Sequence, residues 1–226
     1  MGRQLSDIRP GPRPVAIPLA GGDIVTGIEW RTSDAAILFL HDTEDELALD
    51  SWGAWPDRFA EMGYSVLVVD LPPDRAQDAV TACLSYLTAQ EPPRRFVVAA
   101  GDALRFLDAS AADAFVLVAP RPVGLEPLAL GTAPKLILAG SLDREEFRLV
   151  EVYARACRGW AVLSTYAMEN TMGAFMEGRH AVQVGSQVAG FLQEYRSPEA
   201  LKTKEPRSGT MFRSSIDDET AESDIR

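Results

Sequence analysis

Few side chains in this sequence could move protons or act as nucleophiles near neutral pH. The chain has two histidines, His41 and His180, and two cysteines, Cys83 and Cys157. A general base is normally a histidine, so these two histidines limit the acid–base chemistry to be expected. Both cysteines lie in apolar helical patterns far apart in the sequence. We therefore expect buried free thiols rather than a disulfide.

An acidic cluster at Glu44, Asp45, Glu46 and Asp50 is the one candidate for binding a divalent cation, because hard cations prefer carboxylates. The cluster lacks the D-x-D-x-D-G spacing of a calcium loop, so we expect a solvated group of charges and no metal site. The sequence has neither a P-loop nor the glycine fingerprint of a dinucleotide site. Gly21-Gly22 fits a hairpin turn, and we expect no cofactor.

Solid apolar runs alternate with helical patterns along most of the chain, which is typical of a mainly parallel sheet covered by helices on both faces. A β-hairpin is expected over 15–30, around Gly21-Gly22. The expected strands are 35–40, 64–70, 96–100, 114–120, 134–140 and 160–167. The expected helices are near 52–62, 74–90, 103–107, 145–157 and 180–195. The pattern predicts an α/β three-layer sandwich with an N-terminal antiparallel hairpin.

The organisation predicted from composition is one domain over 14–196 between two less ordered ends. Residues 1–13 are rich in Pro, Gly and Arg, and we expect a flexible N-terminus. Residues 197–226 are polar, with seven acids and five bases, and cannot bury enough apolar surface to offset their ordering entropy. We expect a disordered tail there.

Charge and hydropathy exclude some partners. The net charge of −11 argues against a nucleic-acid-binding surface, which needs a basic patch. No apolar run approaches the roughly 20 residues that span a bilayer, and no apolar core of a secretion signal follows the N-terminal arginines. We expect a cytoplasmic protein that binds neither nucleic acid nor a membrane.

Three stretches in this order resemble motifs of the α/β-hydrolase superfamily, in its small form without a cap domain. ILFLHD at 37–42 and GYSVLVVDLP at 63–72 resemble the family's His-Gly loop and the strand that follows it. PKLILAGSLD at 134–143 resembles the strand that ends in G-x-x-D and carries the acid of the catalytic triad. The resemblance covers about residues 15–195.

The resemblance implies a nucleophile on a strand-to-helix elbow, here AAGDAL at 99–104. One register puts Gly101 at the nucleophile position and the other puts Asp102 there, and neither supplies a serine or cysteine. Some relatives use an aspartate nucleophile, so Asp102 could form a covalent ester. The interpretation we favour is an aspartate near a helix N-terminus, because Leu104 is large for an elbow.

The resemblance places the triad acid at Asp143, which could alternatively cap a helix. The histidine position, after the last strand, is taken by Asn170, whose amide cannot act as a general base. His180 follows ten residues later, and we do not expect it to replace the missing base. His41 is expected to support the oxyanion loop, where Asp42 replaces the motif's glycine.

These departures predict a pseudo-hydrolase that binds a ligand or partner at the former active-site crevice. An alternative is an active hydrolase with Asp102 as nucleophile, Asp143 as acid and His180 as base. A third hypothesis is an interaction protein that works through its tail. The sequence leaves the ligand, the partner and the oligomeric state open.

Overall fold

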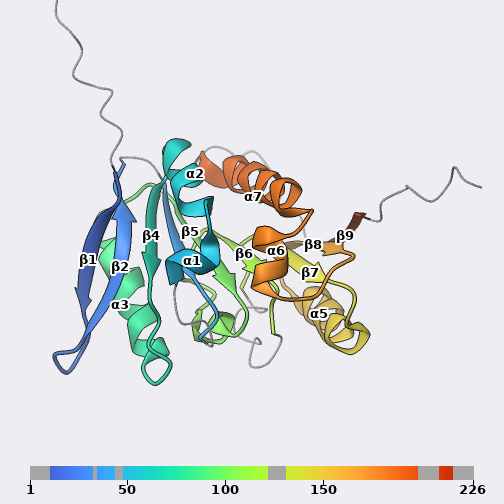
Figure 1. The fold of residues 1–226 in the computed structure, drawn as a ribbon, viewed down its shortest axis with the longest axis horizontal. Coiled ribbons are helices and arrows are strands. Elements are labelled where there is room, and N and C mark those ends of the chain that lie inside the picture. The colour runs from blue at the N-terminus through green and yellow to red at the C-terminus, as the bar shows by residue number, and fades with distance from the viewer. Residues whose placement is uncertain (1–10, 33–34, 44–47, 122–130, 198–208, 216–226) are drawn as a thin grey trace, which may run out of the picture.

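A computed structural model describes residues 11–32, 35–43, 48–121, 131–197 and 209–215. Within these residues nine strands form one sheet in the order β1-β2-β4-β3-β5-β6-β7-β8-β9, with β1 and β9 at opposite edges (Figure 1). β2 is antiparallel to both β1 and β4, and every other neighbouring pair is parallel. The strands are β1 Arg13–Pro18, β2 Ile24–Trp30, β3 Ala36–Leu40, β4 Ser65–Val69, β5 Arg95–Ala100, β6 Ala114–Val118, β7 Lys135–Gly140, β8 Trp160–Tyr166 and β9 Gly209–Ser215.

Helices cover both faces of the sheet and make a three-layer sandwich (Figure 1). One face packs against α1 Ala48–Trp52, α2 Trp55–Glu61, α6 Met172–Glu177 and α7 Ala181–Arg196. The other face packs against α3 Ala76–Thr88, the 3₁₀ turn η1 Ala103–Phe106 and α5 Arg144–Ala156. The predicted fold class is therefore confirmed, as are the hairpin and the six predicted strands.

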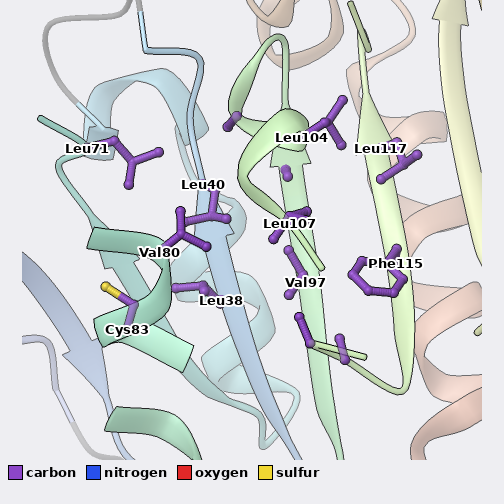
Figure 2. Close-up of a cluster of buried hydrophobic side chains, with 14 of the residues drawn as sticks. Leu38, Leu40, Leu71, Val80, Cys83, Val97, Leu104, Leu107, Phe115 and Leu117 are labelled. Carbon is purple, nitrogen blue, oxygen red and sulfur yellow. The ribbon is translucent and has the colours of Figure 1, made fainter. Parts of the chain in front are cut away.

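The central strands are solid apolar runs because both of their faces are covered. On β3, Leu38 and Leu40 point towards α3 and contact Val80 and Cys83 within one core cluster (Figure 2). The intervening Phe39 points to the opposite face, where it meets Trp52 edge-on with ring centroids 5.0 Å apart. Each alternate position of the strand thus lies in a different core. Cys83 and Cys157 are both buried and free, as expected.

The helix predicted near 103–107 is present as a single 3₁₀ turn, Ala103–Phe106, and Leu107 is already extended. Asp108 ends the turn, because its Oδ1 accepts hydrogen bonds from the Ser110 backbone N–H and hydroxyl. Such local side-chain bonds compete with helix formation. A short helix that the sequence pattern did not predict, α6, lies between β8 and α7.

The expectation of a disordered tail over 197–226 is wrong for residues 209–215. Gly209–Ser215 forms β9, which pairs with β8 along its whole length. Thr210 donates a hydrogen bond to the Ala154 carbonyl at 2.8 Å, and the guanidinium of Arg155 lies over the Phe212 ring at 4.9 Å. The strand is held by backbone hydrogen bonds, which a count of apolar residues does not register. The flexible N-terminus predicted over 1–13 is wrong at its last residue, because Arg13 begins β1. The rest of the two predicted flexible ends falls mainly on residues 1–10, 198–208 and 216–226, which lie outside the described residues.

We predict that β9 contributes to the stability of the domain. Truncation after residue 208 should lower Tm by at least about 3 °C, because it removes a full strand pairing worth upwards of roughly 1 kcal/mol. Truncation after residue 215 keeps β9 and is the matched control. Differential scanning fluorimetry of the two truncations and the full chain checks this, and equal melting temperatures for both truncations would contradict it.

Candidate ligand-binding crevice at the carboxyl edge of the sheet

Gly101 follows directly after β5 and adopts a backbone conformation that favours glycine. Its φ is +56°, and a Cβ built on it would lie 1.8 Å from Oδ2 of Asp42. Its N–H donates to the Val118 carbonyl, and its own carbonyl accepts from the Arg121 N–H, each at 3.2 Å. The tight turn is therefore fixed by the neighbouring strand β6. No side chain fits at this turn while Asp42 keeps its position.

Asp42 follows β3, and its carboxylate lies in the space above the Gly101 turn. The residue is buried, with Oδ2 3.4 Å from a guanidinium nitrogen of Arg121. Its carboxyl group is also within hydrogen-bonding reach of Asp102. The guanidinium of Arg121 lies close enough to stabilise a negative charge on Asp42.

Asp102 binds the loop after β3 rather than projecting into open space. Its Oδ1 accepts from the Thr43 backbone N–H at 2.9 Å, and its Oδ2 accepts from the Thr43 hydroxyl at 2.6 Å. Arg105 adds an ion pair at 3.2 Å. Burial alone raises the pKa of Asp102, but the Thr43 hydrogen bonds, the contact with Asp42 and the charge of Arg105 outweigh burial and lower this pKa below its ordinary value. Asp102 is thus an ionised group that holds the loop.

His41 is buried and joins two loops. Its Nε2 accepts from the Leu71 backbone N–H at 2.9 Å, so Nδ1 carries the ring proton and donates to the Asp42 carbonyl at 2.6 Å. Both ring nitrogens are engaged in backbone hydrogen bonds. His41 therefore supports the loop that carries Asp42, which is the role expected for it.

Asn170 lies in the loop between β8 and α6, and both the oxygen and the nitrogen of its side-chain amide are hydrogen-bonded within the protein. Its Oδ1 accepts from the Gly140 N–H at 2.9 Å, while its Nδ2 donates to Oε1 of Glu146 at 3.1 Å and to the Pro120 carbonyl at 3.4 Å. The residue is buried and pins its loop to the end of β7. The neutral amide is well suited to this place, because it must both accept and donate.

Asp143 and His180 stand apart from this group. Asp143 is exposed and caps α5, with Oδ1 accepting from the backbone N–H groups of Glu145 and Glu146 at 3.0 Å. His180 begins α7, where its Nε2 accepts from Arg179 at 3.0 Å and its ring lies against Tyr166. Neither residue lines the crevice described below. The helix-cap interpretation of Asp143 is the one its hydrogen bonds fit.

A crevice of about 210 Å³ lies at the carboxyl edge of the sheet. Three residues that the sequence analysis named as site positions line it together: Asp42, Gly101 and Asn170. The remaining lining residues are Ala119, Arg121, Thr171, Met172 and Gly173. The predicted acidic cluster at 44–46 lies outside the described residues. Among the residues that the structure does describe, no three His, Cys, Asp or Glu side chains are grouped to hold a metal ion. In the same part of the chain, no helix is both long and apolar enough to cross a membrane.

The arrangement of strands and helices has counterparts among solved structures. The esterase Pf2001 of Pyrococcus furiosus has a TM-score of 0.66 at 13% identity, over 87% of this chain and 98% of its own. A dienelactone hydrolase from Anabaena variabilis has a TM-score of 0.69 at 15% identity, over 84% and 100%. A predicted CIB-like hydrolase from Thermoplasma acidophilum has a TM-score of 0.64 at 16% identity, over 82% and 99%. The chain has the α/β-hydrolase fold. No model of a protein family and no curated protein matches its sequence.

In this fold the nucleophile sits on the turn after β5, at the start of a helix, and the backbone N–H groups that bind the oxyanion come from the next residue and from the loop after β3. Here that turn is Gly101, with φ in the left-handed region. The helix after it is reduced to η1. The loop after β3 includes Thr43, whose N–H is bound by the Asp102 carboxylate. The turn after β5 therefore carries no side chain, and the Thr43 N–H of the loop after β3 already has a partner.

Three residues important to the crevice were not found from the sequence: Thr43, Arg121 and Glu146. Thr43 adjoins the His-Asp pair, and a hydroxyl there could have been considered as a partner of Asp102. Arg121 follows β6, and parallel strands bring their carboxyl ends to one edge, so its approach to Asp42 could also have been anticipated. Nothing in the sequence pattern indicates the contact between Glu146 and Asn170, because it depends on how α5 is placed.

We predict that Gly101→Ser destabilises the protein because the new side chain collides with Asp42. Overpacking of this kind costs about 1–3 kcal/mol, which lowers Tm by about 2–12 °C at this chain length. In an Asp42→Gly background the obstructing atoms are gone, and the same substitution should cost less than half as much. Thermal denaturation of the wild type, both single variants and the double variant gives the coupling. An equal fall in both backgrounds would show that Asp42 is not the obstacle.

Proposed function

We propose that this protein is a non-catalytic member of the α/β-hydrolase fold that binds a small polar ligand, or a polar side chain of a partner, in the crevice at the carboxyl edge of its sheet. The observation that carries the proposal is the position of Asp42. Its carboxylate fills the space that a nucleophile's side chain on Gly101 needs. An enzyme of the serine type requires that space for its reactive group.

The remaining catalytic positions support the same interpretation. Asn170 stands where the fold places its histidine, and an amide cannot take up and return a proton near neutral pH. The Thr43 N–H, a donor of the loop that stabilises the oxyanion in active relatives of this fold, is bound by Asp102. Asp102 is poorly placed as an alternative nucleophile, because its two oxygens hold Thr43 and Arg105.

The size and lining of the crevice favour a small polar ligand. Its volume of about 210 Å³ falls below the roughly 300–1,000 Å³ of sites that hold drug-sized molecules. Asp42, Arg121, Asn170 and Thr171 bring charge and hydrogen-bonding groups to it. Ala119 on its wall has φ of 45°, a conformation that is strained for a residue other than glycine. Backbone strain of this kind clusters at ligand and active sites, which supports a binding role.

We predict that the purified protein does not hydrolyse p-nitrophenyl acetate above a heat-denatured control. A fluorophosphonate probe should leave every serine unlabelled, since no serine stands on the turn after β5. Rates are followed by absorbance and labelling by intact-mass spectrometry. Stoichiometric labelling of one serine, or turnover abolished by a single substitution in the crevice, would contradict the proposal that the protein is non-catalytic.

We predict that small polar probes bind in the crevice and that Gly173→Leu blocks them. A Cβ on Gly173 meets no atom within 4 Å, so a larger side chain there extends into free space at the crevice wall. Acetamide, acetate and guanidinium are titrated separately, and ¹H–¹⁵N spectra should show shifts at Gly101, Ala119 and Thr171. Gly190→Leu, at an exposed and equally unobstructed glycine of α7, is the matched control. The binding proposal fails if no probe moves the crevice signals, or if Gly173→Leu and Gly190→Leu respond alike.

A further inference from the structure

The second edge of the sheet is formed by β9, which, within the described residues, pairs with a neighbouring strand on one side only. The Gly209 N–H donates to the Gly159 carbonyl at 3.2 Å, and Gly209 is paired with Trp160 in the parallel register. In a parallel pair, alternate residues of a strand direct both backbone groups to the same neighbour. Residues 209, 211, 213 and 215 therefore face β8, while Thr210, Phe212 and residue 214 direct their N–H and C=O groups to the open edge.

The two edges of the sheet differ in how well they are protected from a further strand. β1 carries Pro14 and Pro18, and proline, which has no N–H, is a common device for blunting an exposed edge. β9 is seven residues long and has no proline and no lysine. Phe212 in its middle is 45% exposed. An edge of this kind is a template for strand addition.

Arginines line the flank of α5 that borders this edge. Arg155 is placed beside β9 by its contact with Phe212. Arg144 and Arg148 share its side of the helix by spacing, and all three are exposed. Arg213 of β9 lies on the opposite face of the sheet, beside α7, and adds a positive charge to the strand. Among the described residues none of these four arginines has an ion pair within 4.0 Å.

The flank of α5 beside β9 is positively charged, whereas the molecule as a whole is negatively charged. By helical spacing, Glu151 is the one acidic residue of α5 on the same side as its three arginines. The net charge of this flank is therefore positive. The whole chain has a net charge of −11. Unpaired arginines beside free backbone donors and acceptors form a surface that suits an extended, negatively charged segment. A second copy is disfavoured, because a two-fold contact would bring the same arginines against each other.

We propose that β9 binds an extended acidic segment of a partner protein, which adds to the sheet as a tenth strand. Main-chain hydrogen bonds to Thr210, Phe212 and residue 214 hold the segment. Side chains of an added strand alternate between the two faces of the sheet. Every second residue of the segment therefore faces α5, and these are the positions at which acidic side chains meet Arg144, Arg148 and Arg155.

The test measures binding of two synthetic heptapeptides of the same composition to the full chain by isothermal titration calorimetry. The first, acetyl-Thr-Glu-Val-Glu-Val-Glu-Thr-amide, has acids at alternate positions. The second, acetyl-Glu-Glu-Glu-Thr-Val-Val-Thr-amide, has them in a block. We expect the alternating peptide to bind at least about fivefold more tightly, and its affinity to fall as the NaCl concentration rises from about 50 to 500 mM, because salt screens exposed charges.

Two pairs of variants separate the backbone contribution from the charge contribution. Ser214→Pro removes an N–H that faces the open edge and leaves the pairing with β8 intact. It should therefore abolish peptide binding while Tm stays almost unchanged. Ser214→Ala, which keeps the N–H, is its control. Arg148→Glu should weaken binding by about fivefold. Arg58→Glu, at an exposed arginine of α2, should not change it.

Other occupants of the edge would appear as distinct results. Equal affinity for the two peptides, no binding, or binding that survives Ser214→Pro overturns the proposal. If the alternating peptide binds only after truncation at residue 215, the C-terminal residues of this chain occupy the edge, and the proposal of a partner segment is overturned. A dimer by light scattering that Ser214→Pro dissociates identifies a second copy as the occupant, which also overturns it.

Discussion

The contact between Asp42 and Gly101 is the constraint on which the crevice depends. Asp42 can lie above the turn only because residue 101 has no Cβ, and the turn can keep its left-handed backbone at low cost only because residue 101 is glycine. The position of Asp42 and the glycine at residue 101 therefore depend on each other. Once the carboxylate is there, Arg121 stabilises its charge, and Asp102 is placed to bind Thr43. A chain with a nucleophile at residue 101 would need all of these contacts to change together.

The parallel sheet explains why residues so distant in sequence meet at this point. Asp42, Gly101, Arg121 and Asn170 follow β3, β5, β6 and β8, and parallel strands bring their carboxyl ends to one edge. The apolar cores on the two faces of the sheet fix the strands and do not depend on the chemistry at their ends. For this reason the fold does not depend on which chemical groups stand at the ends of its strands.

The strands could be predicted because both of their faces are buried, which requires solid apolar runs such as AILFL in β3. The crevice could be predicted in part, since the positions of Gly101, Asp42 and Asn170 follow from strand ends. The features that the sequence did not predict depend on other interactions. Asp108 ends η1 after a single 3₁₀ turn by a local hydrogen bond, and β9 is held by backbone pairing with β8. Neither interaction changes the periodicity of apolar residues, so the sequence pattern did not indicate them.

The hydrogen bonds of the crevice also decide where a ligand can bind within it. Enzymes keep their donors and bases unsatisfied until substrate arrives, at a cost in stability. Here the Thr43 N–H, the ring of His41 and the amide of Asn170 are all satisfied within the protein. A ligand that approached the turn at Gly101 would have to replace the bond between Thr43 and the ionised Asp102, which is charge-assisted and strong. Arg121, whose side chain is 44% exposed, and Thr171 also line the crevice. If a ligand binds there as proposed, the hydrogen bonds already made around Gly101 favour a place beside Arg121 and Thr171 over one at the turn itself.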